Sequence, residues 1–221
     1  MIWMAATIVF LTALLGASYG GHPLTAGFAK AAASTCFIMV AVTRGAFRSR
    51  YGRLIFAGLV LSWFGDVFLT GRSEVLFLAG LVSFLLGHVA YTCAFVAHGI
   101  RPRWAGVALV ALSPVVFFVL RWLLPHVDGG MKGPVFAYIL VITLMVVFAW
   151  GARGKGGHFS IPIGAMLFFL SDIAVSRNRF VVPESMDWLW GLPLYYVAQL
   201  FLAYSVSTTL AASDPHEEET L

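Results

Sequence analysis

The stretch RLIFAGLVLSWFGDVFLT, residues 53–70, decides the fold class of this chain. After its first arginine it is almost entirely apolar, and it is close to the roughly 20 residues that a helix needs to cross a bilayer. Asp66 interrupts it. A carboxylate at such a depth costs about 2.5 kcal/mol or more even on the mildest insertion scale, so it normally faces a protein interior and has a function.

A second stretch has the same pattern. Residues 159–176 read FSIPIGAMLFFLSDIAVS, with Asp172 directly after Ser171. When the two stretches are aligned on their aspartates, Gly58 falls on Gly164. Two interpretations fit this alignment: a weak parallel repeat of two four-helix halves, or two membrane helices of similar composition.

The composition extends this interpretation to the whole chain. Of its 221 residues, 60% are hydrophobic and only 11% are charged, whereas about 25% are charged in a soluble domain. Short polar segments divide the chain into eight apolar stretches, each about long enough to cross a bilayer. They predict an all-α bundle of eight transmembrane helices, at residues 2–20, 23–43, 53–70, 75–97, 104–124, 133–151, 159–176 and 187–210. We expect one transmembrane domain, residues 1–210, and a short acidic tail, residues 211–221, that is disordered.

The loop charges predict the orientation. The loops after the second, fourth and sixth spans carry most of the arginines, and the positive-inside rule places such loops in the cytoplasm. Both termini are then cytoplasmic, and we expect the protein in the inner membrane of a bacterium. The net charge of +4 reflects this asymmetry of the loops. It provides no basic patch for nucleic acid, so we expect no nucleic-acid partner.

Polar residues within the spans gather at one depth. At 1.5 Å of rise per residue, eight of them fall in the outer half of the membrane: Lys30, Asp66, His88, Tyr138, Asp172, Tyr195, Tyr196 and Gln199. Helical spacing of three or four places Ser62 on the face of Asp66 and Tyr91 on the face of His88. The pattern predicts a polar cavity that opens outward or into the outer leaflet.

Two carboxyls and an imidazole in a low-dielectric pocket suit a reaction that needs a general acid and a general base. Proton relays in transporters use the same groups. Each residue also has a structural interpretation. Asp66 and Asp172 can be members of ion pairs, and His88 can bond to a backbone carbonyl. Lys30 can extend to the membrane surface, and the serines, tyrosines and Gln199 can join helices. Arg177 and Arg179 suit contacts with headgroups.

Metal and cofactor motifs are missing from the sequence. It contains no HExxH, and no GxGxxG or GxxxxGK[ST] loop of the kind that holds a dinucleotide or a nucleoside triphosphate. Only His88 lies within a span, so a three-histidine zinc site lacks its ligands; a metal held by two aspartates and one histidine stays possible. We expect no metal and no cofactor. Cys36 and Cys93 form no CxxC pair, and we expect both to be buried free thiols.

Five motifs follow one another along the chain: Ser62-Trp-Phe-Gly65-Asp66, Phe77 to Tyr91 around His88, Leu167 to Asp172, Asn178-Arg179-Phe180, and Tyr195-Tyr196-Val-Ala-Gln199. In this order and spacing they resemble the lysoplasmalogenases, also called YhhN-like membrane proteins. The resemblance covers essentially the whole chain. One departure is that Ala31 follows Lys30, where the family often has proline.

The resemblance implies a membrane hydrolase that cleaves the vinyl ether of lysoplasmalogens to a fatty aldehyde and a glycerophospho-base. A lysophospholipid and the bilayer lipids would be its partners, without metal or organic cofactor. We expect Asp66 and Asp172 to face each other across one pocket beside His88, as acid and base in an order that the sequence leaves open. The expected substrate-binding residues are Lys30, Ser62, Tyr91, Tyr138, Ser171, Tyr195, Tyr196 and Gln199.

A second function class stays open. A proton-coupled transporter of a small molecule or lipid would use the same pair of aspartates. The gathering of polar residues in one half of the membrane favours the enzyme, whereas the weak repeat favours the transporter. The exact lipid and the oligomeric state are left open by the sequence.

Overall fold

The computed structural model describes residues 1–71, 73–183 and 185–211. Within these residues, eight helices are long and apolar enough to cross a membrane, which confirms the predicted all-α fold. Their bounds are α1 (Ile2–Tyr19), α2 (Pro23–Thr43), α3 (Arg50–Leu69), α4 (Glu74–His98), α5 (Pro102–Leu123), α6 (Gly129–Gly154), α7 (Ser160–Ser176) and α8 (Trp188–Ala211). Three short helices are η1 (Ala46–Arg48), η2 (Leu124–His126) and η3 (Arg177–Val181). The chain is a multi-pass integral membrane protein.

The helix starts follow from local sequence. Ser49 caps α3, because its hydroxyl accepts a 3.0 Å hydrogen bond from the amide of Gly52. Ser73 caps α4 in the same way, through the amide of Leu76 at 3.2 Å. Proline opens α2 and α5, where its missing N–H and fixed φ suit the first turn. The chain leaves α4 at Gly99, whose φ of +107° is strained for any other residue.

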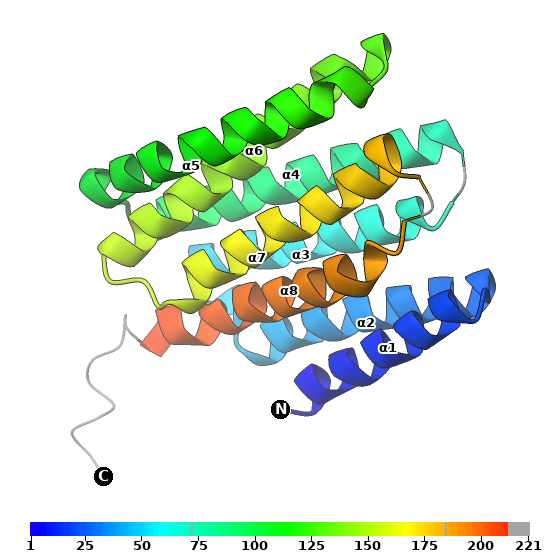
Figure 1. Ribbon diagram of the computed structural model, residues 1–221. Helices are drawn as coiled ribbons and strands as arrows, with labels where there is room; N and C mark the ends of the chain where they lie inside the picture. Colours follow the sequence, from blue (N-terminus) through cyan, green and yellow to red (C-terminus); the bar gives the residue numbers. More distant parts are fainter. Residues whose placement is uncertain (72, 184, 212–221) are drawn as a thin grey trace.

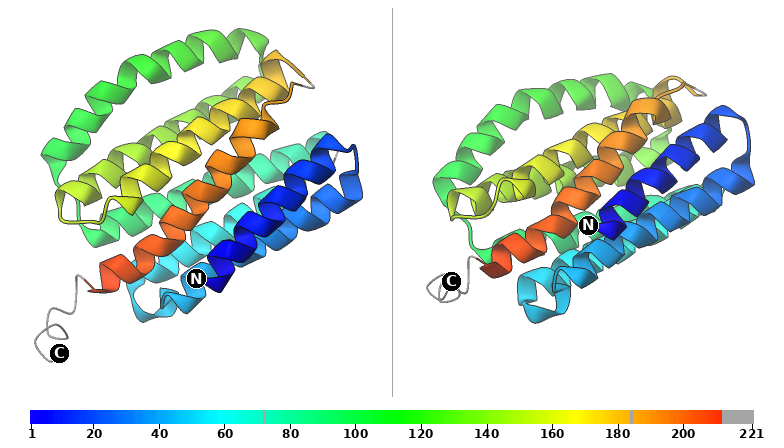
Figure 2. Two further views of the ribbon diagram at one scale, coloured as in Figure 1. Left: turned by 60° about the horizontal axis from the view of Figure 1, so that its bottom comes forward. Right: turned by 90° about the horizontal axis from the view of Figure 1, so that it is seen from below.

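Six helices of the described chain form a closed ring, with successive contacts α2–α3–α4–α6–α7–α8 and back to α2. Helix α1 packs outside the ring against α2 and α8, and α5 packs outside it against α6 (Figure 1). In both views of Figure 2, α5 lies at the outer edge of the molecule. Burial agrees with this arrangement, since 11% of the apolar window of α5 is buried but 61% of that of α6.

The outer face of the bundle is apolar. Large side chains such as Val107, Val110 and Phe118 on α5 are exposed. Exposed apolar surface on this scale is typical of a face that contacts lipid. Cys36 is buried as predicted, but the prediction is wrong for Cys93, which lies exposed on α4. Its side of α4 faces away from the ring, and a small apolar thiol is suited to lipid.

Glycines bring α3 and α4 close together and position two aromatic side chains. Gly58 faces the ring of Tyr91, and Gly65 faces the ring of Phe84, where an added Cβ would lie 2.6 Å from Cδ2. Gly164 on α7 likewise faces Leu202 on α8. The two glycines that the sequence alignment superposes, Gly58 and Gly164, therefore both allow close packing against the next helix.

The chain continues past the predicted end of the seventh span. Directly after α7, η3 forms a turn of π-helix, closed by a 2.9 Å hydrogen bond from the amide of Val182 to the carbonyl of Arg177. π-turns are rare and occur frequently at functional sites, because the extra residue redirects the side chains that follow. Here the turn carries Asn178, Arg179 and Phe180 to the rim of a cavity.

Candidate active site

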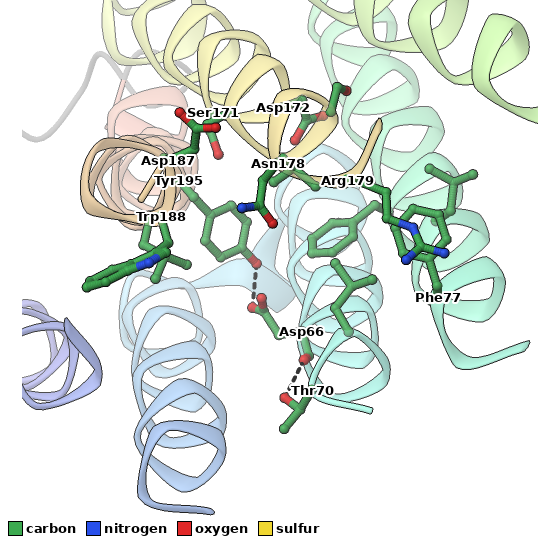
Figure 3. A pocket seen from close by; sticks show the side chains of 18 of the residues that line it. Asp66, Thr70, Phe77, Ser171, Asp172, Asn178, Arg179, Asp187, Trp188 and Tyr195 are labelled. Atoms are coloured by element: carbon green, nitrogen blue, oxygen red, sulfur yellow. Dashed lines mark hydrogen bonds between the residues drawn. The ribbon is translucent and has the colours of Figure 1, made fainter. Parts of the chain in front are cut away.

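A cavity of about 650 Å³ occupies one end of the ring. This end holds the α1–α2, α3–α4 and α7–α8 connections, at the right of Figure 1, away from the start of α1 and the end of α8. Side chains from α1 and from all six ring helices line the cavity, and Asp66 and Asp172 are both among them (Figure 3). The polar residues that the sequence places at one depth thus belong to one end of the bundle.

Asp66 on α3 is surrounded by donors. Its Oδ2 accepts hydrogen bonds from the hydroxyls of Ser34 and Tyr195, both at 2.6 Å. Its Oδ1 lies 3.3 Å from Nζ of Lys30, and only 2% of its side chain is exposed. Lys30 therefore pairs with a carboxylate instead of extending to the membrane surface. Hydroxyl donors and an ammonium form the partner set of an ionised carboxylate.

Asp172 on α7 is held on one side only. Its Oδ2 accepts a 2.8 Å hydrogen bond from the hydroxyl of Tyr138 and lies 3.3 Å from Nε2 of His88. Its Oδ1 has no hydrogen-bond partner among the described residues. The side chain is 17% exposed and lines the cavity. One carboxyl oxygen of Asp172 is therefore fixed, and the other is available to a ligand.

His88 lies behind Asp172 and is fully buried. Its Nε2 is 3.0 Å from the Tyr138 hydroxyl, and its ring meets the ring of Phe168 edge-on at 4.6 Å between centroids. Within the described chain, Nδ1 of His88 is buried without a partner. A proton on Nε2 alone fits this pattern, because an imidazolium would bury a second N–H with no acceptor.

An aromatic layer links the two carboxyl groups. The hydroxyl of Tyr195 bonds to Asp66, and the centroid of its ring lies 5.2 Å from that of the Phe168 ring. The Phe168 ring in turn contacts His88. Phe84 packs edge-on against both rings. No hydrogen bond joins Asp66 to Asp172 in the part of the chain that the structure describes. The two aspartates share one cavity but have separate partners.

The remaining predicted site residues divide into two groups. Lys30, Tyr138, Ser171 and Tyr195 line the cavity with the aspartates. Four others lie behind its wall and are buried: Ser62, Tyr91, Tyr196 and Gln199.

The residues behind the wall bond mainly to one another. The hydroxyl of Tyr91 donates a 2.7 Å hydrogen bond to Oε1 of Gln199 and lies 3.4 Å from the hydroxyl of Ser62. Tyr196 donates to the carbonyl of Lys30 at 3.1 Å. These contacts join α2, α3, α4 and α8, as expected of polar side chains between membrane helices.

The rim of the cavity contains a network that the sequence does not reveal. Asp187, buried in the loop before α8, accepts hydrogen bonds from Arg177, Ser185 and Trp190. Burial by itself would raise the pKa of Asp187, but the hydrogen bonds from Ser185, Trp190 and Arg177 and the Arg177 charge together lower it. In sequence Asp187 is one of several loop charges, and loops have no periodicity that would distinguish it.

No group of three or more His, Cys, Asp and Glu side chains that would suit a metal ion occurs among the described residues. His88 and Asp172 form a pair, and the nearest partners of Asp66 are hydroxyls and an ammonium. The expectation that the protein works without metal stays a prediction.

Known proteins resemble this chain over most of its length. The sequence model of the YhhN family matches residues 25–206. Lysoplasmalogenase TMEM86A of Bos taurus is 30% identical over 159 residues, 68% of this chain and 64% of that protein. Lysoplasmalogenase TMEM86B of Homo sapiens is 31% identical over 155 residues, 70% of this chain and 64% of that protein. Lysoplasmalogenase TMEM86B of Mus musculus is 33% identical over 153 residues, 69% of this chain and 62% of that protein.

The aligned region thus spans slightly less than two thirds of these relatives. No solved structure matches the chain. The family match begins two residues into α2 and ends within α8, so it contains the whole six-helix ring except for short ends, together with both aspartates and His88. On this evidence the chain belongs to the YhhN family.

Proposed function

We propose that this protein is a membrane hydrolase that cleaves the vinyl ether bond of a lysoplasmalogen or a related lysolipid, giving a fatty aldehyde and a glycerophospho-base. Its relatives of about 30% identity are named lysoplasmalogenases. The observation that carries the proposal is the free Oδ1 of Asp172, which lies on a cavity of about 650 Å³ within a transmembrane ring.

The chemistry of a vinyl ether requires an acid. A proton adds to the distal alkene carbon and gives an oxocarbenium ion at the carbon that bears oxygen. Water then adds to this carbon and loses a proton, and the hemiacetal that results collapses to aldehyde and alcohol. Glycoside hydrolysis passes through a similar oxocarbenium-like transition state, and its enzymes likewise use a pair of carboxyl groups. The site therefore needs one proton donor that reaches carbon, one acceptor for the proton of water, and negative charge nearby.

Asp172 fits the role of the proton donor. Tyr138 and His88 fix its Oδ2, which leaves Oδ1 to carry the proton and to face the substrate. After the transfer, the carboxylate of Asp172 can take the proton from the attacking water. One carboxyl group then acts as acid and as base in turn and is restored at the end of the cycle. Asp172 is therefore the acid that we propose, a choice that the sequence leaves open.

Asp66 fits the role of the fixed charge. The hydroxyls of Ser34 and Tyr195 and the ammonium of Lys30 are all donors, so they favour its ionised form. A carboxylate on the wall of a water-poor cavity stabilises positive charge that develops on the substrate. Asp66 therefore supports the oxocarbenium ion while Asp172 moves the proton.

The cavity also suits the shape of a lysolipid. Apolar residues such as Leu81, Val135 and Ile139 line one flank, and polar residues such as Asn178 and Arg179 lie at the rim. With cytoplasmic termini, as the loop charges predict, the cavity would lie in the outer half of the bilayer. A lysophospholipid would then enter from the outer leaflet.

The interior of the ring beyond the cavity supports an enzyme over a proton-coupled transporter. Phe37, Ile55, Leu59 and Met145 are each fully buried there in one apolar cluster. A transporter needs a path that opens in turn to both faces of the membrane. A filled interior favours a cavity with access from one end only.

Purified protein in liposomes tests the proposal by the release of fatty aldehyde from lysoplasmalogen. The matched control substrate is the lysophospholipid with an ester in place of the vinyl ether, which should release no aldehyde. We expect turnover with the vinyl ether alone. If the folded wild-type protein releases no aldehyde but moves protons or lipid across the membrane, the transporter is the correct function.

A further inference from the structure

We propose that Arg179 is the binding residue for the phosphate diester of the lysolipid, at the rim of the cavity. This inference rests on the proposed function, because it deepens the description of the same substrate. It makes the protein selective for lipids that carry a phosphate headgroup over alkenylglycerols that carry none.

Among the residues that the structure describes, three cations at or beside the cavity differ in their partners. Lys30 lies 3.3 Å from the carboxylate of Asp66. Arg177 is paired with the buried carboxylate of Asp187. Arg179 lines the cavity and is exposed, and it forms no ion pair with any residue that the structure describes. Of these three, Arg179 alone has its charge available to an anionic ligand.

The guanidinium of Arg179 is also held in place. Its Cζ lies 4.3 Å from the centroid of the Phe77 ring (Figure 3). That ring packs edge-on against the ring of Phe180, at 6.0 Å between centroids. A guanidinium stacked on a ring uses its face and leaves its N–H donors in plane. Those donors can bind two phosphate oxygens at once. Because the side chain is already ordered by Phe77, less entropy is lost on binding.

The backbone at the rim is fixed as well. The π-turn of η3 brings Arg179 to the cavity side of the helix end. The side-chain nitrogen Nδ2 of Asn178 donates a 2.9 Å hydrogen bond to the backbone carbonyl of Ser185, across the loop to α8. Asp187 holds the same loop through Ser185 and Arg177. Arg179 is therefore presented from a tethered segment.

The distance between Arg179 and the proposed acid, Asp172, allows one lysolipid molecule to contact both residues. Arg179 follows Asp172 by seven positions on the same helical segment, which corresponds to about 10 Å along its axis. In a lysolipid the phosphate and the vinyl ether are attached to opposite ends of one glycerol. The guanidinium lies over Phe77, which lines the same cavity as Asp172, so a phosphate at Arg179 leaves the alkene within reach of Asp172.

A binding experiment tests this inference without turnover. The ligand is a lysophosphocholine with a saturated 1-O-alkyl ether, which the proposed chemistry cannot cleave, and its partner is the 1-O-alkylglycerol without headgroup. Both are titrated into detergent-solubilised wild-type protein and into Arg179→Gln. The matched control is Arg121→Gln, which changes an exposed arginine of α5 at the same end of the bundle and outside the cavity lining.

We expect Arg179→Gln to weaken binding of the alkyl lysophosphocholine about tenfold or more and to leave the alkylglycerol unchanged. Arg121→Gln should change neither affinity. Arg179→Lys should recover only part of the loss, because an ammonium cannot bind bidentately. Glycerophosphocholine and inorganic phosphate, tested as competitors, should bind far more weakly than the lipid, since the tail supplies most of the burial.

Three results would overturn the inference: equal weakening of both ligands in Arg179→Gln, no weakening of either, or no binding of the alkyl lysophosphocholine by wild-type protein. Phe77→Leu provides a second variant should Arg179→Gln fail to fold, and it should weaken only the phosphate-bearing ligand. Failure of the proposed function has a different signature. In that case the saturated lipid still binds through Arg179, but the vinyl ether releases no aldehyde.

Discussion

The hydroxyl of Tyr138 on α6 donates a 2.8 Å hydrogen bond to the same oxygen of Asp172 that lies 3.3 Å from Nε2 of His88. Both partners therefore act on Oδ2, and Oδ1 is left to the cavity. Asp66 differs, because the partners Ser34, Tyr195 and Lys30 occupy both of its oxygens. This difference between two otherwise similar carboxyl groups leads to separate predictions for each.

Asp172→Asn should abolish most turnover. The amide keeps the shape of the side chain and a hydrogen-bond acceptor but has no acidic proton. We expect kcat for aldehyde release to fall by about 10²–10⁴-fold, the range typical of a lost general acid. Affinity for the saturated ether analogue should change little. Near-wild-type kcat in the folded variant would show that Asp172 is not the proton donor.

Tyr138→Phe should lower kcat by about tenfold or more, because Tyr138 stabilises the carboxylate that forms as Asp172 gives up its proton. A hydrogen bond to a charged group contributes about 1.5–3 kcal/mol. His88→Gln should also impair turnover, since it removes the second group at Oδ2. The decisive measurement is the double variant Tyr138→Phe, Asp172→Asn. If Tyr138 acts through Asp172, the double variant is no slower than Asp172→Asn alone. Additive losses would contradict that coupling.

The Asp66–Lys30 pair should separate stability from catalysis. Asp66→Asn leaves Lys30 without its carboxylate and should lower Tm as well as kcat, the latter by about 10²-fold or more. Lys30→Met should lower Tm too, because the buried Asp66 loses its cation. The double variant should recover much of the Tm but not the kcat. Recovery of both would mean that Asp66 has only a structural role.

Asp187 predicts a pH-dependent stability. Its folded-state pKa is lowered, so its contribution to stability is fully present above the unfolded-state pKa of about 3.9. The contribution is lost as the pH falls below that value toward the folded-state pKa. Asp187→Asn should therefore have a lower Tm than wild type at pH 7, and the difference should shrink below about pH 4. A constant difference down to pH 3 would contradict the assignment.

Gly65→Ala should disturb the cavity wall. Its Cβ would lie 2.6 Å from Phe84, which packs against Tyr195. We expect a loss of about 1–3 kcal/mol from overpacking, together with lower activity. Gly106→Ala on α5 is the matched control, because nothing lies within 4 Å of its added Cβ. Its unfolding free energy should stay unchanged or rise by about 0.5–1 kcal/mol. Equal effects of the two variants would contradict the packing argument.

The sequence predicts the helices well because apolar runs and their breaks are local features. The second span, residues 23–43, coincides with α2, and the others agree with their helices to within a few residues at each end. The largest differences are at α6, which begins at Gly129 instead of residue 133, and after α7, where η3 continues to Val181. A π-turn has no characteristic periodicity, so its continuation is not visible in the apolar pattern.

The site is predicted less completely, because spacing within a helix does not determine the partner across helices. His88 and Tyr91 are three residues apart and share a face of α4. His88 nevertheless contacts Asp172, whereas Tyr91 bonds to Gln199 behind the cavity wall. Arg177 and Arg179 are equivalent in sequence, and only the fold pairs one of them with Asp187. Such choices depend on tertiary packing.

Helix α1 lies outside the ring, and the match to the family begins at residue 25, after α1 has ended. Nevertheless Leu14 and Ser18 of α1 form part of the cavity wall. A helix in this position can exchange its inward side chains without disturbing the contacts that close the ring or the partners of either aspartate. In the enzyme that we propose, substrate preference is therefore separable from the chemistry. For the proposed enzyme, we expect that changes at Leu14 and Ser18 alter the preference for the lipid chain and leave the two aspartates as they are.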